Sequence, residues 1–220
     1  TTVDGNIYIT GNGGTDFWSG LQAHGVEFGG DGQDHFTVTS TGQGTINISG
    51  TSGYNAGIGV LISADTGSTI TSSYGDINIT GISTAHDVSS NYGIYVGQQS
   101  LIQSLQTANI TLTGTGSGTG TTDQNHGITL EDSCRILTKD GSIVLNGQAG
   151  DATGNSNIGI QIINDHIRST GKGDITLNGT GGDSVGTGNS GISANGGDIQ
   201  SQGSGNIYLY GTGKGSGLAC

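Results

Sequence analysis

The aspartates of the glycine-rich segments are the first residues whose chemistry could make a functional site. Asp151 and Asp183 each stand six residues before the asparagine of a recurring N-x-G motif. Regularly placed aspartates in such loops are typical of calcium-binding repeats. Calcium takes about six to eight oxygen ligands, whereas each of these loops offers one carboxylate in that phase. We therefore expect solvated loop acids and no cofactor, with calcium at Asp151 and Asp183 as the alternative.

Catalytic groups are the second kind of chemistry to consider. Glycoside hydrolysis needs two carboxyl groups within about 5–10 Å of each other. At the position of Asp76, the neighbouring repeats carry Thr45 and Asn109, so no carboxylate pair forms there. The five histidines are scattered, and no two recur at a metal-ligand spacing in adjacent repeats. The sequence therefore predicts a protein that is not an enzyme.

Exposed aromatic rings are a third candidate, because a ring can stack on a sugar. Trp18 lies in the irregular first repeat, and Tyr8, Tyr208 and Tyr210 occupy outward positions of predicted strands. We expect these four residues to be the candidate ligand contacts. For Trp18, covering the open end of the array or packing against it is the favoured role, with a ligand contact as the alternative.

Charge excludes some partners. The net charge is -12, and residues 1–134 contain no lysine or arginine. All basic residues follow that point: Arg135, Lys139, Arg168, Lys172 and Lys214. Phosphate binding needs clustered cations, so we expect no nucleic-acid partner. No apolar run is long enough to span a membrane.

The elements that would position these residues come from a repeat. A G-x-I-x-[IL]-x-G motif, or a close variant, starts near residues 5, 44, 75, 108, 141, 173 and 205. Each copy alternates apolar and polar residues, which is typical of a half-buried strand. A second motif, N-x-G-I, follows in most repeats, and a third short strand with one central apolar residue follows that. Three strand motifs in fixed order predict stacked coils, since each motif must lie on its own copy.

The predicted fold is therefore all-β: a right-handed parallel β-helix, or β-solenoid, of about six to seven coils of roughly 32 residues with three short strands each. The right hand follows from the preference of parallel crossovers. We expect one domain over residues 1–220. Because the chain lacks methionine and starts inside the repeat pattern, we expect it to be an excerpt of a longer repeat protein.

The asparagines of the second motif keep one phase in the repeat. They are Asn55, Asn91, Asn125, Asn157 and Asn189. Stacked side-chain amides can bond to one another along an array, as in cross-β stacks. We therefore predict a structural asparagine ladder at one corner, with ligand binding as the alternative.

The two cysteines, Cys134 and Cys220, are about three repeats apart. Stacked coils are separated by about 4.8 Å, which puts these residues roughly 14 Å apart along the axis. A disulfide needs Cα atoms within about 7 Å. We expect no bridge unless the tail folds back.

These motifs, with proline-free loops rich in glycine, threonine, serine and asparagine, resemble the repeats of filamentous-haemagglutinin-like and autotransporter-type bacterial surface proteins. The resemblance covers residues from about 5 to 211. It implies a secreted parallel β-helix that serves as a stalk, an adhesive fibre or a matrix component.

We therefore expect a non-enzymatic structural or adhesive module at the bacterial cell surface or in the extracellular matrix, forming a rigid rod or fibre. Its partners would be further copies of itself, or glycans of host or neighbouring cells. The alternative is a glycan-binding or polysaccharide-degrading β-helix protein.

Overall fold

The computed structural model describes residues 1–14, 23–29, 35–54, 57–86 and 88–215. Every regular element in this part of the chain is a β-strand, and the strands form three parallel sheets. The described chain makes six complete coils and a seventh strand of the first sheet. The predicted β-solenoid is confirmed, with three strands per coil.

The first sheet contains the G-x-I-x-[IL]-x-G strands. They are β1 (Ile7–Asn12), β4 (Ile46–Thr51), β7 (Ile77–Ile82), β10 (Ile110–Thr115), β13 (Ile143–Gln148), β16 (Ile175–Thr180) and β19 (Ile207–Thr212).

The second sheet contains the strands that follow the N-x-G-I motif. They are β2 (Val26–Gly29), β5 (Val60–Ser63), β8 (Ile94–Val96), β11 (Ile128–Glu131), β14 (Ile160–Ile163) and β17 (Ile192–Asn195).

The third sheet contains the short polar strands. They are β3 (Thr37–Ser40), β6 (Thr69–Ser72), β9 (Leu101–Ser104), β12 (Arg135–Thr138), β15 (His166–Ser169) and β18 (Asp198–Ser201).

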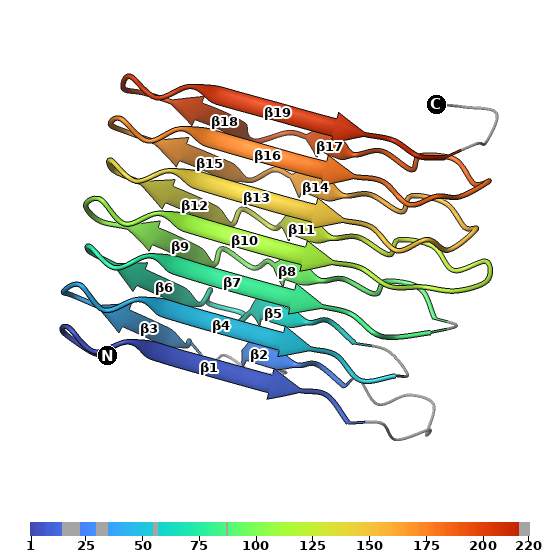
Figure 1. The fold of residues 1–220 in the computed structure, drawn as a ribbon, viewed down its shortest axis with the longest axis horizontal. Helices are drawn as coiled ribbons and strands as arrows, with labels where there is room; N and C mark the ends of the chain where they lie inside the picture. Colours follow the sequence, from blue (N-terminus) through green and yellow to red (C-terminus); the bar gives the residue numbers. More distant parts are fainter. Residues whose placement is uncertain (15–22, 30–34, 55–56, 87, 216–220) are drawn as a thin grey trace.

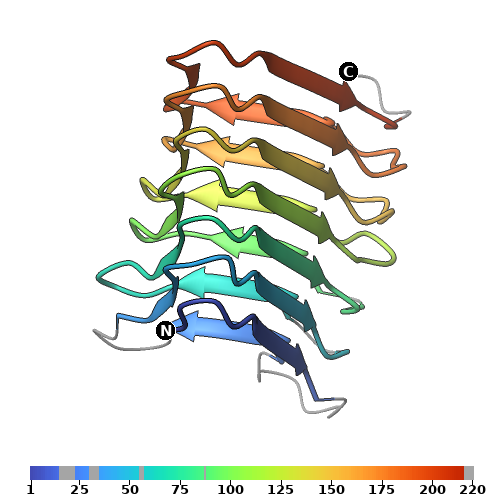
Figure 2. The same cartoon turned by 60° about the vertical axis from the view of Figure 1, so that its left-hand side comes forward.

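The path of the chain is right-handed. In Figure 1 the first-sheet strands run from left to right in front, the third-sheet strands run back behind them, and the coils climb from β1 to β19. Figure 2 shows the same stack from the side, with each coil lying on the one before it. Neighbouring strands in a sheet are therefore about one coil apart in the sequence, as Ile110 and Ile143 are.

The core is a narrow column of aliphatic side chains. In one coil, Ile110, Leu112, Ile128, Leu130 and Ile136 are all fully buried. Period-two alternation sends these side chains inward and the residues between them outward. One coil buries too few apolar groups to offset the entropy of ordering its residues, so stability depends on stacking against neighbours.

Two columns of glycine allow the first and second sheets to approach closely. A Cβ on Gly114 would lie 2.1 Å from the carbonyl oxygen of Gly127, and a Cβ on Gly127 would lie 2.3 Å from the amide nitrogen of Gln148. These are contacts with backbone, which cannot rotate away. Both recurrent glycines of the repeat are therefore required by backbone packing at this corner.

Candidate functional site

The asparagine column lies at the corner that leads into the second sheet. Asn91, Asn125 and Asn157 are fully buried, and Asn189 is 8% exposed, whereas Asn55 lies outside the described residues. Asn91 Nδ2 donates to Asn125 Oδ1 at 3.0 Å, and Asn125 Nδ2 donates to Asn157 Oδ1 at 2.9 Å. The backbone amides of Asn125 and Asn157 donate to the Oδ1 atom of the next asparagine, at 3.0 and 2.9 Å. The side-chain oxygens of Asn125 and Asn157, and that of Asn189, are thus used within the stack, whereas the buried Asn91 Oδ1 has no hydrogen-bond partner among the described residues.

A second polar column stands exposed at the start of the first sheet. Asn6 Oδ1 accepts from the Thr45 amide at 2.9 Å, Asp76 Oδ1 accepts from the Asn109 amide at 2.8 Å, and Asn109 Oδ1 accepts from the Ser142 amide at 2.9 Å. The same capping role is filled here by asparagine and aspartate alike. Asp76 is therefore part of a backbone-capping column that connects neighbouring coils.

The two aspartates considered for calcium lie in adjacent coils. Both are exposed, and Asp151 Oδ1 accepts from the Asp183 amide at 3.1 Å. Within the described ranges, no group of three or more His, Cys, Asp or Glu side chains is placed to hold a metal ion. Asp151 Oδ1 thus caps the backbone of the following coil, and the pair supplies two carboxylates to any site at this position.

The candidate aromatic contacts are spread over the two ends of the stack. Tyr8 in β1 is 71% exposed, and Tyr208 and Tyr210 in β19 stack on each other with ring centroids 6.4 Å apart. β1 and β19 are the outermost strands of the first sheet, so these rings do not share one site. Trp18 lies outside the described residues.

Two histidines serve the backbone at the start of the second sheet. His24 Nδ1 accepts from the Ile58 amide at 3.0 Å, and His126 Nδ1 accepts from the Ile158 amide at 3.1 Å. Both bonds require a neutral ring. The pKa of His126 is lowered to about 4. Burial is the main cause, and it outweighs the hydrogen bond with Gln161, which raises the pKa.

Aromatic rings cover His126 from one side. Tyr92 stacks on His126 with centroids 5.2 Å apart and on Tyr95 at 5.8 Å, and the Tyr95 hydroxyl donates to Glu131. Burial is the main cause that raises the pKa of the Tyr95 hydroxyl. The rings of this cluster stack on one another, and the Tyr95 hydroxyl is hydrogen-bonded within it. These contacts are typical of residues that stabilise the fold.

Cys134 lies at the buried corner between the second and third sheets. Its backbone amide donates to Asp165 Oδ1 at 2.8 Å, and Asp165 Oδ2 accepts from the Ile163 amide at 3.1 Å. Burial raises the pKa of both the Cys134 thiol and the Asp165 carboxyl. A fully buried thiol with a raised pKa is a packing residue. Cys220 lies outside the described residues.

The basic residues gather on the third sheet. We call the strands β9, β12, β15 and β18, with the three residues after each, the cationic face. It contains Arg135, Lys139, Arg168 and Lys172 against Asp140 and Asp198. Four of the five basic residues of a chain with net charge -12 therefore lie on one face. The corresponding segments of β3 and β6, residues 37–43 and 69–75, carry no charge.

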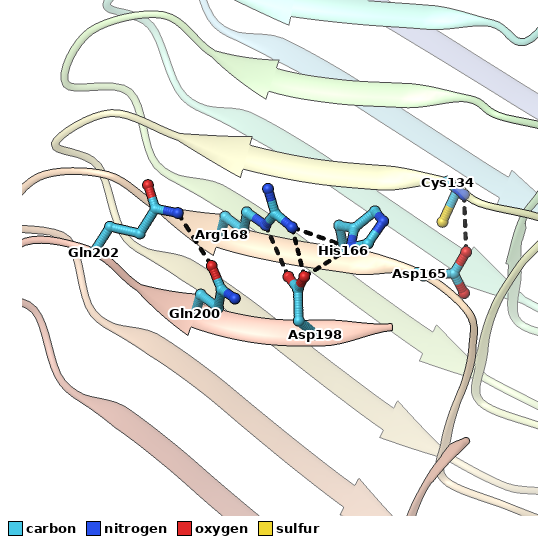
Figure 3. Close-up of polar contacts among 7 residues, drawn as sticks. All are labelled: Cys134, Asp165, His166, Arg168, Asp198, Gln200 and Gln202. Atoms are coloured by element: carbon cyan, nitrogen blue, oxygen red, sulfur yellow. Dashed lines mark hydrogen bonds and ion pairs between the residues drawn. The ribbon is translucent and has the colours of Figure 1, made fainter. Parts of the chain in front are cut away.

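A polar cluster on this face joins two adjacent coils. Arg168 Nε donates to Asp198 Oδ1 at 2.8 Å, and its Nη2 donates to Oδ2 at 2.5 Å (Figure 3). His166 Nδ1 lies 3.0 Å from Asp198 Oδ2. The hydrogen bonds from Arg168 are the main cause that lowers the pKa of the Asp198 carboxyl. The bidentate contact fixes the guanidinium plane, and Figure 3 shows Nη1 pointing away from Asp198.

A groove of about 350 Å³ runs beside this cluster, between the outward residues of the third sheet and the turns that follow. We call it the axial groove, because its residues come from four successive coils. Its lining includes Gln103, Leu105, Leu137, Lys139, Arg168 and Gln202. It spans three coil spacings, or about 14 Å. It thus combines cations, amides and aliphatic surface in one extended depression.

The sequence alone did not lead us to this cluster. The signal was present, because aligning H-I-R-S (166–169) above D-I-Q-S (198–201) places His166 over Asp198. The contact of Arg168 with Asp198 is diagonal, since Arg168 pairs with Gln200 in the register. An arginine side chain is long enough to reach such a neighbour.

The described part of the chain contains no helix of the length and apolarity that crossing a membrane requires. No family model matches the chain, and no curated protein or solved structure shows significant similarity to it.

Proposed function

We propose that this chain is a stiff, rod-forming module of a secreted bacterial surface or extracellular-matrix protein, without enzymatic activity. The observation that carries the proposal is the unbroken register of the stack. Each first-sheet strand pairs with the next over six residues, and this pairing recurs across all six interfaces from β1 to β19. Three such ladders around one core oppose bending in every direction.

The surroundings of the core support the same role. Side-chain columns at the corners bond to the backbone of the neighbouring coil, as Asn125 does at one corner and Asp76 at another. The resemblance to filamentous-haemagglutinin-like repeats supports an extracellular location, because those repeats form secreted stalks and fibres. The proposed module would hold a binding or anchoring partner at a fixed distance.

The experiment is to lengthen the rod by whole coils. Inserting a second copy of residues 75–140 after residue 140 adds two coils in phase with the repeat. We expect the dimension along the stacking axis, which is vertical in Figure 1, to grow by about 10 Å in shapes fitted to small-angle X-ray scattering, while the horizontal width of the coils stays constant. The matched control inserts a glycine-serine segment of equal length at the same point, which should add a flexible loop and no rod length.

The same three proteins then test the role at a cell surface. Each is placed between an outer-membrane anchor and a fluorescent reporter, and the distance from reporter to membrane is measured by energy transfer. The distance should increase with the added coils and not with the glycine-serine segment. An unchanged distance for the lengthened rod, or cleavage of a polysaccharide by the purified chain, would contradict the proposal.

A further inference from the structure

The cations of the cationic face are not required by the fold. At the two outward positions of the third-sheet strands, β3 and β6 have Thr37, Thr39, Thr69 and Thr71, and their coils stack in the same register. β12 and β15 place Arg135 and Arg168 at those positions. The ladder forms in both cases, so the stacking register does not require these positive charges.

We propose that the axial groove binds a carboxylated saccharide chain that lies along the solenoid axis, across the third-sheet strands. This inference goes beyond the rod role and does not depend on it. Charge complementarity selects the ligand: the chain is strongly acidic elsewhere, and it places four of its five basic residues on this face. An anion therefore finds favourable potential here and repulsion over the first half of the rod.

The lining matches the groups of such a chain. Lys139 and Arg168 come from adjacent coils and supply the cations for carboxylates. Asp198 holds the Arg168 guanidinium by two hydrogen bonds, which leaves Nη1 free of that contact. Asp198 is thus a positioning residue, because it orients a donor without itself lining the groove.

The remaining groups suit a sugar ring. The amides of Gln103 and Gln202 stand at the two ends of the groove in the coil order. Gln202 Nε2 donates to Gln200 Oε1 at 3.1 Å, and a side-chain amide has a second N–H donor and a carbonyl acceptor for sugar hydroxyls. Leu105 and Leu137 provide aliphatic surface for the C–H face of a ring. Pockets with apolar surface and a few placed polar groups are the usual form of a small-ligand site.

A saccharide fits better than an acidic peptide. A peptide gains affinity on a β-protein by extending a free strand edge. The strands under this groove, β9, β12 and β15, are each paired on both sides, so they offer no ladder positions. The groove also crosses the strands, whereas an added strand would run parallel to them.

The experiment is a calorimetric titration of the full 220-residue chain with two sugars of the same backbone. The first is an oxidised cello-oligosaccharide, in which each primary alcohol has become a carboxylate. The second is the parent cello-oligosaccharide. We expect binding of the oxidised sugar that weakens as salt rises, and at least roughly tenfold weaker binding of the parent sugar.

The variants are Lys139→Gln and the pair Arg168→Gln with Asp198→Asn, which removes the cation without leaving Asp198 unpaired. Each should weaken binding of the oxidised sugar by roughly fivefold. The matched control is Lys214→Gln, which removes one positive charge outside the groove and should leave the affinity unchanged. Lys139 lies in an exposed turn, so its variant should fold even if the double variant does not.

Three results would overturn the inference. They are equal affinity for the two sugars, equal weakening by Lys139→Gln and Lys214→Gln, and tighter binding of polyglutamate than of the oxidised sugar. The last result would assign the groove to an acidic protein segment.

Discussion

The strands β10 and β19 have almost the same sequence pattern, I-T-L-T-G-T and I-Y-L-Y-G-T, in different surroundings. In β10, Ile110 and Leu112 are fully buried, whereas in β19 the equivalent Ile207 and Leu209 are 41% and 53% exposed. β10 lies between β7 and β13, and β19 pairs with β16 alone among the described strands. Both segments nevertheless form six-residue strands in the same register.

This difference separates two things that the repeat encodes. Alternation and glycine placement are enough to make the strand, because β19 forms with one neighbour. The coil that covers a strand buries its inward side chains. Only a covered strand therefore restricts which residues can occupy those positions. Substitutions in a covered coil should therefore cost far more than the same substitutions in an outer coil.

The largest effect is expected at the glycine of the first motif. Gly114→Ala should destabilise the chain by about 3 kcal/mol or more, because its Cβ meets the Gly127 carbonyl at 2.1 Å and overpacking against backbone cannot relax. Gly211→Ala should cost less than about 1 kcal/mol, because the nearest atom to its Cβ is at 3.4 Å. Chemical denaturation of the two variants measures both values, and similar losses would contradict the comparison.

The next effect concerns the two asparagine positions that cap backbone. Asn125→Asp should destabilise the chain by about 2–3 kcal/mol, because it buries a charge and removes the donor to Asn157 Oδ1. Asn6→Asp, in the exposed first coil, keeps its acceptor role toward the Thr45 amide and should change stability by less than about 0.5 kcal/mol. Thermal unfolding of this matched pair tests whether burial is what makes asparagine more stable than aspartate at a capping position. Equal shifts in Tm for the two variants would show that it is not.

The covered coil that contains His126 should also carry a pH dependence that the last coil lacks. The folded-state pKa of His126, about 4, lies below its ordinary value of 6.5, so its stabilising contribution is complete above pH 6.5 and is lost as the pH falls toward 4. The loss should reach about 2–3 kcal/mol near pH 4.5. The equivalent residue in the last N-x-G-I motif is Ser190, which does not titrate in this range.

Replacing the ring measures that contribution directly. His126→Asn keeps an acceptor for the Ile158 amide and should reduce the slope of the free energy of unfolding against pH between about pH 6.5 and 4, leaving the smaller part that comes from His24. Tyr92→Leu removes the stacked ring beside His126 and should keep the slope. An unchanged slope in His126→Asn would assign the pH dependence to other groups.

The smallest expected effect has opposite signs in the two kinds of coil. The Thr138 hydroxyl is buried and has no hydrogen-bond partner among the described residues, so Thr138→Val should stabilise the chain by about 1 kcal/mol. In the outer coil, the Ser201 hydroxyl donates to the Gly205 carbonyl at 2.7 Å, and Ser201→Ala should cost about 1 kcal/mol. Calorimetry should show a higher Tm for Thr138→Val and a lower Tm for Ser201→Ala. A lower Tm for Thr138→Val would contradict the prediction.

The architecture could be predicted from the sequence because each strand motif occurs about seven times. The in-register motifs predicted the three strands per coil, the outward tyrosines, and the apolar–polar alternation that buries residues such as Ile110 and Leu112. A single strand of this kind would be ambiguous, but a motif that must stack on its own copies allows one solution.

The sequence was not sufficient for contacts that cross the register. Arg168 was visible as a cation, but its bond to Asp198 depends on a side chain that leans diagonally across two coils. The axial groove depends on turns and strands of four coils together, and no single repeat contains it. The role of His126 depends on the depth of its burial, which the isolated N-H-G-I motif does not reveal.

The side-chain caps at the corners also have a direction along the chain. Asn109 Oδ1 accepts from the backbone amide of Ser142 in the following coil. The backbone amide of Asn125 donates to Asn157 Oδ1, which is also in the following coil. Each coil is therefore completed by the one that comes after it in the chain. A stack that grows from its first coil therefore ends in a coil whose caps stay unfilled until the next coil is added.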